Sequence, residues 1–169
     1  MKNCKKCGLE LPLDDFHIDN SKKDKHKTIC KKCISKKKSV NKKIKLDKNI
    51  RQSLIYCLKY NGPFKWGSIL GFTKEDLINH LQSKFKDNMS FDNYGKVWGV
   101  TFYIPKRCYN FSSIINQELK KCWSLKNLKP EYLDLIRKQK IEIRKKDLIE
   151  NYLWDILPLG DISKWLKDE

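Results

Sequence analysis

Apolar residues recur at helical spacing in the middle of the chain and predict two helices. The first includes Leu54 and Leu58, four residues apart, and it ends at Asn61-Gly62-Pro63, whose residue types favour a turn. The second begins at Thr73, because Thr73 and Asp76 have the spacing of a capping box. One apolar face of this second helix consists of Leu77, Ile78, Leu81 and Phe85.

A strand and two further helices are predicted in the second half of the chain. The run from Val97 to Ile104 is rich in aromatic and β-branched residues, and Pro105 ends it. A helix is expected after Pro130. Near the C-terminus, an amphipathic helix closed by Pro158 is predicted from apolar residues spaced i, i+1, i+4 and i+5, which are Leu148, Ile149, Tyr152, Leu153, Ile156 and Leu157.

The balance of charge indicates a polyanionic partner. The 169 residues carry a formal charge of +17, and residues 1–50 hold 16 Lys against 6 acidic residues. Lys outnumbers Arg 33 to 4, which favours contacts with phosphates over reading of base edges, where bidentate Arg dominates. An AT-rich genome would produce the same bias toward Lys. No apolar run approaches the length of a membrane span, so we expect no membrane partner.

Two Cys-x-x-Cys knuckles predict a metal site near the N-terminus. Cys4 and Cys7 form one knuckle, Cys30 and Cys33 form the other, and Gly8 suits the tight turn after the first. Four thiolates fill the shell of one tetrahedral Zn²⁺, so the expected ion is structural. Two disulfides or four unrelated core cysteines are the alternatives. Nothing resembles a signal peptide, so we expect an intracellular, non-secreted protein with bound metal.

The residues between the two knuckles predict short strands, and the residues after the second knuckle are basic. Short strands with alternating patterning are predicted from Leu9, Leu11, Leu13, Phe16 and Ile18, too few apolar residues to fold without the metal. Residues 34–48 form a basic linker or a basic helix. They are either a solvated connector or a segment that contacts phosphates, through Lys36, Lys37, Lys38, Lys42 and Lys43.

Behind the two knuckles follow blocks from Ile69 to Phe85 and from Met89 to Trp98, then Ile104-Pro105 and a block from Lys121 to Pro130. In this order, from residue 4 to about residue 140, the motifs resemble those of the HNH endonucleases of phages and large DNA viruses. The resemblance implies an α+β fold with a zinc ribbon at residues 1–33 and a basic linker or helix at 34–48. A degenerate ββα-metal domain at 49–140 and a C-terminal helical extension at 141–169 complete it.

The catalytic residues of that family are missing from this chain. Gly99 stands where the family has its first His, Thr101 where it has the metal-binding Asp, and Phe102 where it has the general base. Ile136 falls at the last metal ligand, and Asn127 alone matches. A phenyl ring and a sec-butyl group neither bind Mg²⁺ nor accept a proton, so the resemblance implies an inactive scaffold. Phe102 and Ile136 are expected to face each other as an apolar plug.

The remaining histidine and cysteines have ordinary structural explanations. His80 is expected to make a structural hydrogen bond. Cys57, Cys108 and Cys122 lack knuckle spacing and are expected as small buried apolar residues. A second metal site at Cys108 and Cys122 is the alternative.

The sequence therefore predicts a non-catalytic, HNH-derived, zinc-containing nucleic-acid-binding protein of viral or phage origin, acting inside an infected cell. DNA is the expected partner, although contacts of Lys with phosphate do not distinguish DNA from RNA. The HNH-like domain would add phosphate contacts from Lys106, Arg107, Lys126 and Lys129. Two alternatives remain: a viral adaptor or assembly subunit that binds viral or host proteins, and an unorthodox metal-dependent endonuclease.

Overall fold

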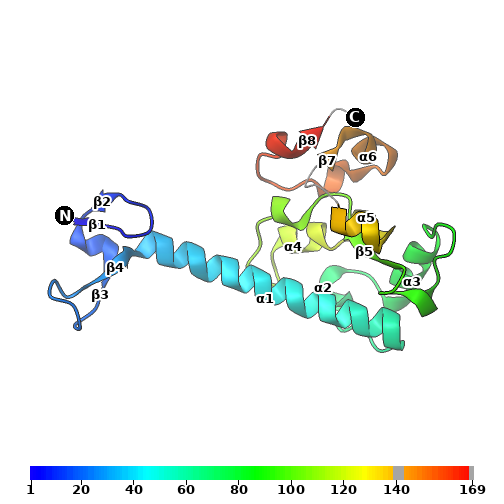
Figure 1. The fold of residues 1–169 in the computed structure, drawn as a ribbon, viewed down its shortest axis with the longest axis horizontal. Coiled ribbons are helices and arrows are strands. Elements are labelled where there is room, and N and C mark those ends of the chain that lie inside the picture. The colour runs from blue at the N-terminus through cyan, green and yellow to red at the C-terminus, as the bar shows by residue number, and fades with distance from the viewer. Residues whose placement is uncertain (139–142, 168–169) are drawn as a thin grey trace. The chain divides into compact units, whose positions relative to one another are not determined.

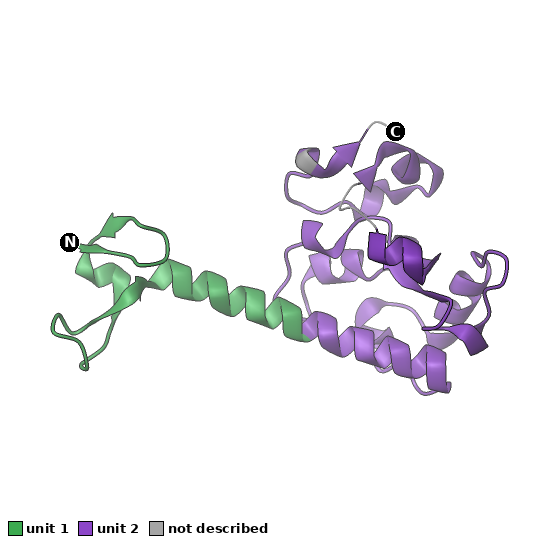
Figure 2. Ribbon diagram, viewed as in Figure 1, with its two compact units in different colours: residues 1–45 green, residues 46–169 purple. Residues whose placement is uncertain are grey.

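The computed structural model describes residues 1–138 and 143–167 of the chain (Figure 1). It divides into a first compact unit, Met1–Lys45, and a second, Leu46–Glu169 (Figure 2). One helix, α1 (Lys31–Tyr60), begins in the first unit and ends in the second. The boundary expected between residues 140 and 141 lies outside the described residues.

The first unit is built from two small antiparallel strand pairs. Strand β1 (Lys2–Asn3) pairs with β2 (Glu10–Leu11), and β3 (Phe16–Ile18) pairs with β4 (His26–Cys30). Leu11, Phe16 and Ile18 thus lie in strands as predicted, whereas Leu9 precedes β2 and Leu13 begins a 3-10 helix (Leu13–Asp15). Their core is very small, since the buried apolar residues are Cys4, Phe16 and Cys30.

Helix α1 runs for 30 residues because no Gly or Pro interrupts the sequence from Lys31 to Tyr60. Residues 34–48, expected as a linker or a helix, are helical throughout. The helix ends where Asn61 adopts a left-handed φ of 53°, followed by Gly62 and Pro63. In the second unit its buried face consists of Ile50, Leu54, Cys57 and Leu58.

Two helices follow α1, the short α2 (Gly67–Leu70) and the predicted helix α3 (Lys74–Gln82). The capping box is confirmed. The backbone N–H of Asp76 donates to Thr73 Oγ1 over 3.1 Å, and the backbone N–H of Thr73 donates to Asp76 Oδ2 over 2.8 Å. Leu77 and Leu81 are fully buried, but α3 ends at Gln82, so Phe85 lies beyond the apolar face expected to include it.

The centre of the second unit is an antiparallel strand pair followed by a helix. Strand β5 (Trp98–Phe102) pairs with β6 (Leu128–Tyr132), and Val100 lies opposite Pro130. Helix α5 (Leu133–Lys138) follows β6 directly and packs against both strands. The predicted strand and the helix after Pro130 are both confirmed. Between the two strands the chain forms helix α4 (Gln117–Cys122) and the 3-10 helices Lys106–Cys108 and Leu125–Asn127. A further 3-10 helix, Phe91–Asn93, precedes β5.

The single C-terminal helix predicted from Leu148 to Leu157 is wrong. Helix α6 (Lys145–Glu150) stops early, Tyr152 takes a left-handed φ of 50°, and a 3-10 helix (Leu153–Ile156) follows. This break lets Leu148, Leu153 and Ile156 all reach the core, while Tyr152 is exposed. Two further short strands, β7 (Ile143–Arg144) and β8 (Leu166–Lys167), pair in parallel, and a 3-10 helix (Ser163–Trp165) precedes β8.

Trp98 anchors the core of the second unit. It is fully buried, and the rings of Phe85, Phe91 and Tyr94 surround it at centroid distances of 4.8, 6.1 and 5.0 Å. Its indole N–H donates to the carbonyl oxygen of Ser90 over 2.7 Å, so the ring is held both by aromatic packing and by a hydrogen bond. Among the described residues, no helix combines the length and the apolar character needed to cross a membrane.

Candidate metal centre and nucleic-acid interface

The four cysteines of the two knuckles come together at the base of α1. Their sulfur atoms all lie within 4.8 Å of one another, and all four are free thiols. A tetrahedral Zn²⁺ with bonds of about 2.3 Å has sulfur atoms about 3.8 Å apart, so a bound ion requires only a small contraction. The cluster therefore fits a metal ion and contradicts the alternative of two disulfides.

Backbone hydrogen bonds build this cluster from local turns. Gly8 has a φ of 72°, which glycine adopts readily, and its N–H donates to the carbonyl oxygen of Cys4 over 2.9 Å. The N–H of Cys30 donates to Cys4 Sγ over 3.3 Å and so ties the end of β4 to the first knuckle. Cys33 belongs to the first turn of α1. The site therefore joins β1, β4 and α1.

Hydrogen bonds and burial shift the pKa values of two of the thiols in opposite directions. The backbone N–H of Cys30 lowers the pKa of Cys4 to about 6, because this hydrogen bond stabilises the thiolate. The neighbouring Cys30 side chain and burial raise the pKa of Cys33 to about 12. Not all four sulfurs can therefore be thiolates without a cation, and a divalent metal would replace the remaining protons.

Neither histidine of this unit belongs to the cluster. His17 is exposed, and His26 Nδ1 lies 2.6 Å from the carbonyl oxygen of Asp24. Within the described ranges, the four cysteines are the one group of three or more His, Cys, Asp or Glu side chains close enough to hold an ion. Cys57, Cys108 and Cys122 are buried, as expected.

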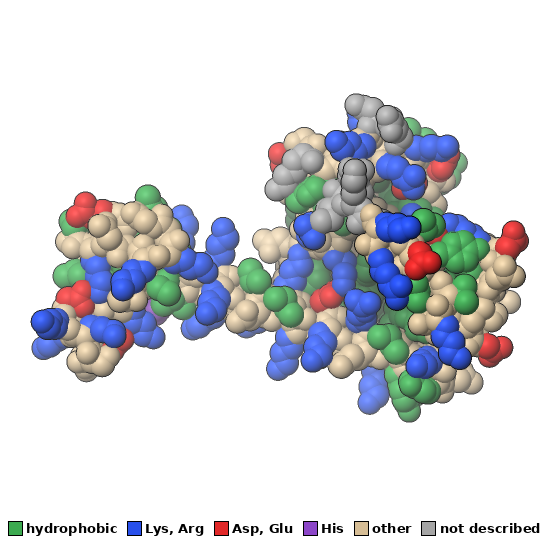
Figure 3. Space-filling view, viewed as in Figure 1, with side chains coloured by type: hydrophobic (Ala, Val, Ile, Leu, Met, Phe, Trp, Pro, Cys, Tyr) green, Lys and Arg blue, Asp and Glu red, His purple; other side chains and the backbone are tan. Residues whose placement is uncertain are grey.

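The metal candidate is followed directly by a basic segment of α1. Residues 31–45 contain eight Lys and no acidic residue. Of the five Lys predicted here as phosphate contacts, Lys43 is half-buried and the others are exposed: Lys36, Lys37, Lys38 and Lys42. On the face drawn in Figure 3, basic side chains are spread over each unit and acidic side chains are sparser.

The four basic residues predicted to bind phosphate from the second unit are mostly engaged within the protein. Lys106 Nζ lies 2.6 Å from Asp47 Oδ2, and Lys126 Nζ lies 2.7 Å from Asp155 Oδ2. Lys129 Nζ lies 4.5 Å from the centroid of the Tyr103 ring, and burial lowers its pKa. Arg107 is exposed. These contacts make the α1 segment the stronger candidate interface.

Asn127 and His80 hold the strand pair in place. Asn127 is fully buried, and its Oδ1 accepts from the N–H of Ile104 over 2.7 Å. Its Nδ2 donates to the carbonyl oxygens of Ile104 and Cys122 over 3.1 and 2.8 Å. His80 Nε2 lies 2.9 Å from the carbonyl oxygen of Leu128, which confirms the structural hydrogen bond expected of His80.

The apolar plug predicted from Phe102 and Ile136 does not close the space between β5 and α5. Both residues line one pocket of about 510 Å³, together with Gly99 and Thr101. The Phe102 ring packs edge-on against Trp123 at a centroid distance of 5.0 Å. A Cβ at Gly99 would lie 3.2 Å from Leu133, so the glycine keeps this wall open. Sequence reasoning missed the pocket because its walls come from residues 51 to 137.

The described chain is thus an α+β protein with a four-cysteine cluster and a long helix. It is similar to the uncharacterized protein L426 of Acanthamoeba polyphaga mimivirus, with 27% identity over 85 residues. The matched region covers 49% of this chain and 37% of the mimivirus protein. This similarity suggests a viral origin. No family model matches the chain, and no solved structure matches it significantly.

Proposed function

We propose that this protein is a non-catalytic, zinc-containing nucleic-acid-binding protein of a virus, acting inside the infected cell. The observation that carries the proposal is the position of the four-cysteine cluster directly before a basic helical segment. Cys30 ends β4 and Cys33 lies in the first turn of α1, so an ion held by both fixes the start of the helix. The ion thereby supports residues 31–45, which contain eight Lys and no acidic residue.

Zinc is the proposed ion because four thiolates are soft ligands in a complete tetrahedral set. When bound, it would supply folding energy and no open position for catalysis. The lysines of α1 would bind phosphates of either strand of a duplex, with affinity from counterion release and little dependence on sequence. DNA is the proposed form of the nucleic acid.

The second unit is proposed to be a degenerate HNH-like domain. The order β5, β6, α5 and the buried hydrogen bonds of Asn127 support this derivation. Gly99, Phe102 and Ile136 offer neither a metal ligand nor a general base, and Thr101 offers one neutral hydroxyl. A hydrolytic role is therefore not proposed.

The test is a titration of labelled duplex DNA followed by fluorescence anisotropy at several salt concentrations. A variant with Lys36→Gln, Lys37→Gln, Lys38→Gln and Lys42→Gln should bind at least about tenfold more weakly at low salt. Its slope of log K against log salt should fall by about 0.9 for each lost phosphate contact. The matched control removes four exposed Lys of the second unit, Lys96, Lys120, Lys138 and Lys146.

The control variant should keep most of the affinity and of the salt slope. Equal losses in both variants would mean that net charge alone drives binding, and the α1 interface would be wrong. A wild-type protein that binds neither duplex DNA nor RNA at low salt would end the nucleic-acid proposal.

A viral adaptor remains the second candidate, and one observation favours it. The C-terminal part of the second unit exposes large apolar side chains, with Trp154 56%, Tyr152 77% and Leu159 81% exposed. Exposed apolar groups of this size are typical of protein contacts. Capture of a viral or host protein that persists after nuclease treatment and at high salt would favour this candidate.

A further inference from the structure

The pocket between α1, β5 and α5 has a composition that fits a particular ligand. Among the described residues, four basic ones line it, Arg51, Lys59, Lys106 and Arg137, and no acidic one does. Its walls also include three aromatic residues, Tyr94, Phe102 and Trp123. A volume of about 510 Å³ lies within the usual range for small-molecule sites.

Two of these cations are available to a ligand. Arg51 and Lys59 are exposed and lie eight residues apart on α1, with Ile55 between them on the same pocket wall. Neither makes an ion pair within the part of the chain that the structure describes. Lys106 is instead paired with Asp47. The pocket therefore offers an anion two charges on one edge, supplied by α1.

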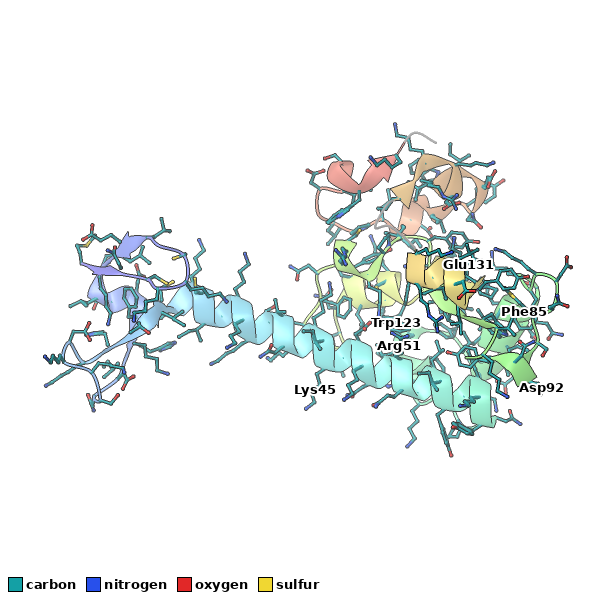
Figure 4. The ribbon with its side chains drawn as sticks, in the orientation of Figure 1. Lys45, Arg51, Phe85, Asp92, Trp123 and Glu131 are labelled. Atoms are coloured by element: carbon teal, nitrogen blue, oxygen red, sulfur yellow. The ribbon has the colours of Figure 1, made fainter. Side chains whose placement is uncertain are left out.

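Trp123 supplies an independent sign of a missing partner. Its side chain lines the pocket and the residue is only 2% exposed, yet its indole N–H has no hydrogen-bond acceptor among the residues that the structure describes. A buried N–H donor without an acceptor costs about 1–3 kcal/mol. By contrast, the equally buried Trp98 has its acceptor on Ser90. Arg51 and Trp123, both labelled in Figure 4, line the same pocket.

We propose that this pocket binds one nucleotide, with its phosphate at Arg51 and Lys59 and its base accepting the indole N–H of Trp123. A nucleobase provides both a flat surface for the aromatic wall and acceptor atoms at its edge. An acyl chain would satisfy the apolar wall but would leave the indole N–H without an acceptor. The nucleotide is either free or an unpaired residue of a single strand.

Tyr94 fits this ligand as well. Burial raises the pKa of Tyr94 to about 12, so its hydroxyl stays protonated at neutral pH and can donate a hydrogen bond. The inference does not rest on the proposed function, because its residues belong to the second unit and the proposed duplex contacts belong to residues 36–42. Each can fail without the other.

The experiment follows the indole N–H resonances of the five Trp by ¹⁵N-correlated NMR, using the full chain. Trp123→Phe assigns the Trp123 resonance, and the other four resonances report whether that variant folds. The probes are the four ribonucleoside 5′-monophosphates, adenosine, inorganic phosphate, a single-stranded decathymidylate and a duplex of mixed sequence. We expect a mononucleotide or the single strand to move the Trp123 resonance selectively.

The affinity of the active probe should fall about tenfold or more in Arg51→Gln with Lys59→Gln, because each side chain provides a charge-assisted hydrogen bond. Lys120→Gln with Lys146→Gln is the matched control, since both side chains are exposed and neither lines the pocket. These surface variants also test the proposal if Trp123→Phe does not fold.

A response to mononucleotides identifies a site for free nucleotide, and a response to the single strand alone identifies an unpaired nucleotide. The proposal is overturned if no probe moves the Trp123 resonance, or if only the duplex does. Equal effects of inorganic phosphate and nucleotides, or unchanged affinity in the Arg51 and Lys59 variant, would also overturn it.

Discussion

Removal of the metal should unfold the first unit and leave the second unit folded. The first unit buries one large apolar side chain, Phe16, besides two of the cysteine ligands. Full burial of such a side chain contributes about 1.5–3 kcal/mol, whereas a structural Zn²⁺ contributes about 10–16 kcal/mol in small modules. The second unit has its own core of more than twenty buried residues and does not depend on the ion.

The assay combines zinc analysis with backbone amide NMR, before and after chelation. We expect one Zn²⁺ per chain, and chelation should collapse the amide dispersion of residues 1–30 while resonances of β5, β6 and α5 persist. Cys30→Ser should have the same effect without chelator, because it removes one of the four sulfur ligands of the cluster.

Cys57→Ala is the matched control, since it removes a buried thiol that lies outside the cluster. That variant should keep one Zn²⁺ per chain and the dispersed spectrum of the first unit. The reasoning is refuted if the wild type contains no zinc, or if the first unit keeps its native spectrum after Cys30→Ser.

Three further outcomes are expected. Zinc affinity in chelator competition should fall as pH decreases from about 8 to 6, because the metal must displace protons from thiols such as Cys33, whose pKa is raised to about 12. A pH-independent affinity would argue against thiolate ligands. Asn127→Ala should lower the free energy of unfolding of the second unit by about 2–4 kcal/mol, because it removes three buried hydrogen bonds. Urea denaturation measures this change, and Lys120→Gln, at an exposed residue, should have little effect. Supercoiled plasmid should stay intact with Mg²⁺ or Mn²⁺, and nicking that Thr101→Val abolishes would contradict the non-catalytic assignment.

Local sequence patterns predicted local structure well. The spacing of two residues between the cysteines was enough to predict the knuckles. The capping box was predicted from Thr73 and Asp76, which lie three positions apart. The C-terminal helix failed because its break at Tyr152 depends on the core. The pattern of apolar residues there is compatible with a continuous helix, but only the left-handed residue brings Leu153 and Ile156 to bury with Leu148.

The pocket could not be predicted because the residues that line it are far apart in the sequence. Arg51 and Lys59 come from α1, Trp123 follows α4, and Ile136 comes from α5. A sequence pattern identifies Phe102 and Ile136 as apolar but does not give the direction of their side chains. The Phe102 ring packs edge-on against Trp123, and the space beside Ile136 remains open as part of the pocket.

Three residues at which the sequence departs from the HNH pattern, Gly99, Phe102 and Ile136, also line this pocket. Gly99 leaves its wall open, because a Cβ there would press on Leu133 and Ile136 at 3.2 and 3.4 Å. Phe102 and Ile136 give the pocket apolar surface, which favours a flat base over a hydrated metal ion. Of the four basic residues that line the pocket, Lys106 and Arg137 are paired with Asp47 and Asp134, which leaves Arg51 and Lys59 of α1 for a phosphate. The proposed ligand would therefore place its phosphate at α1 and its base toward Trp123.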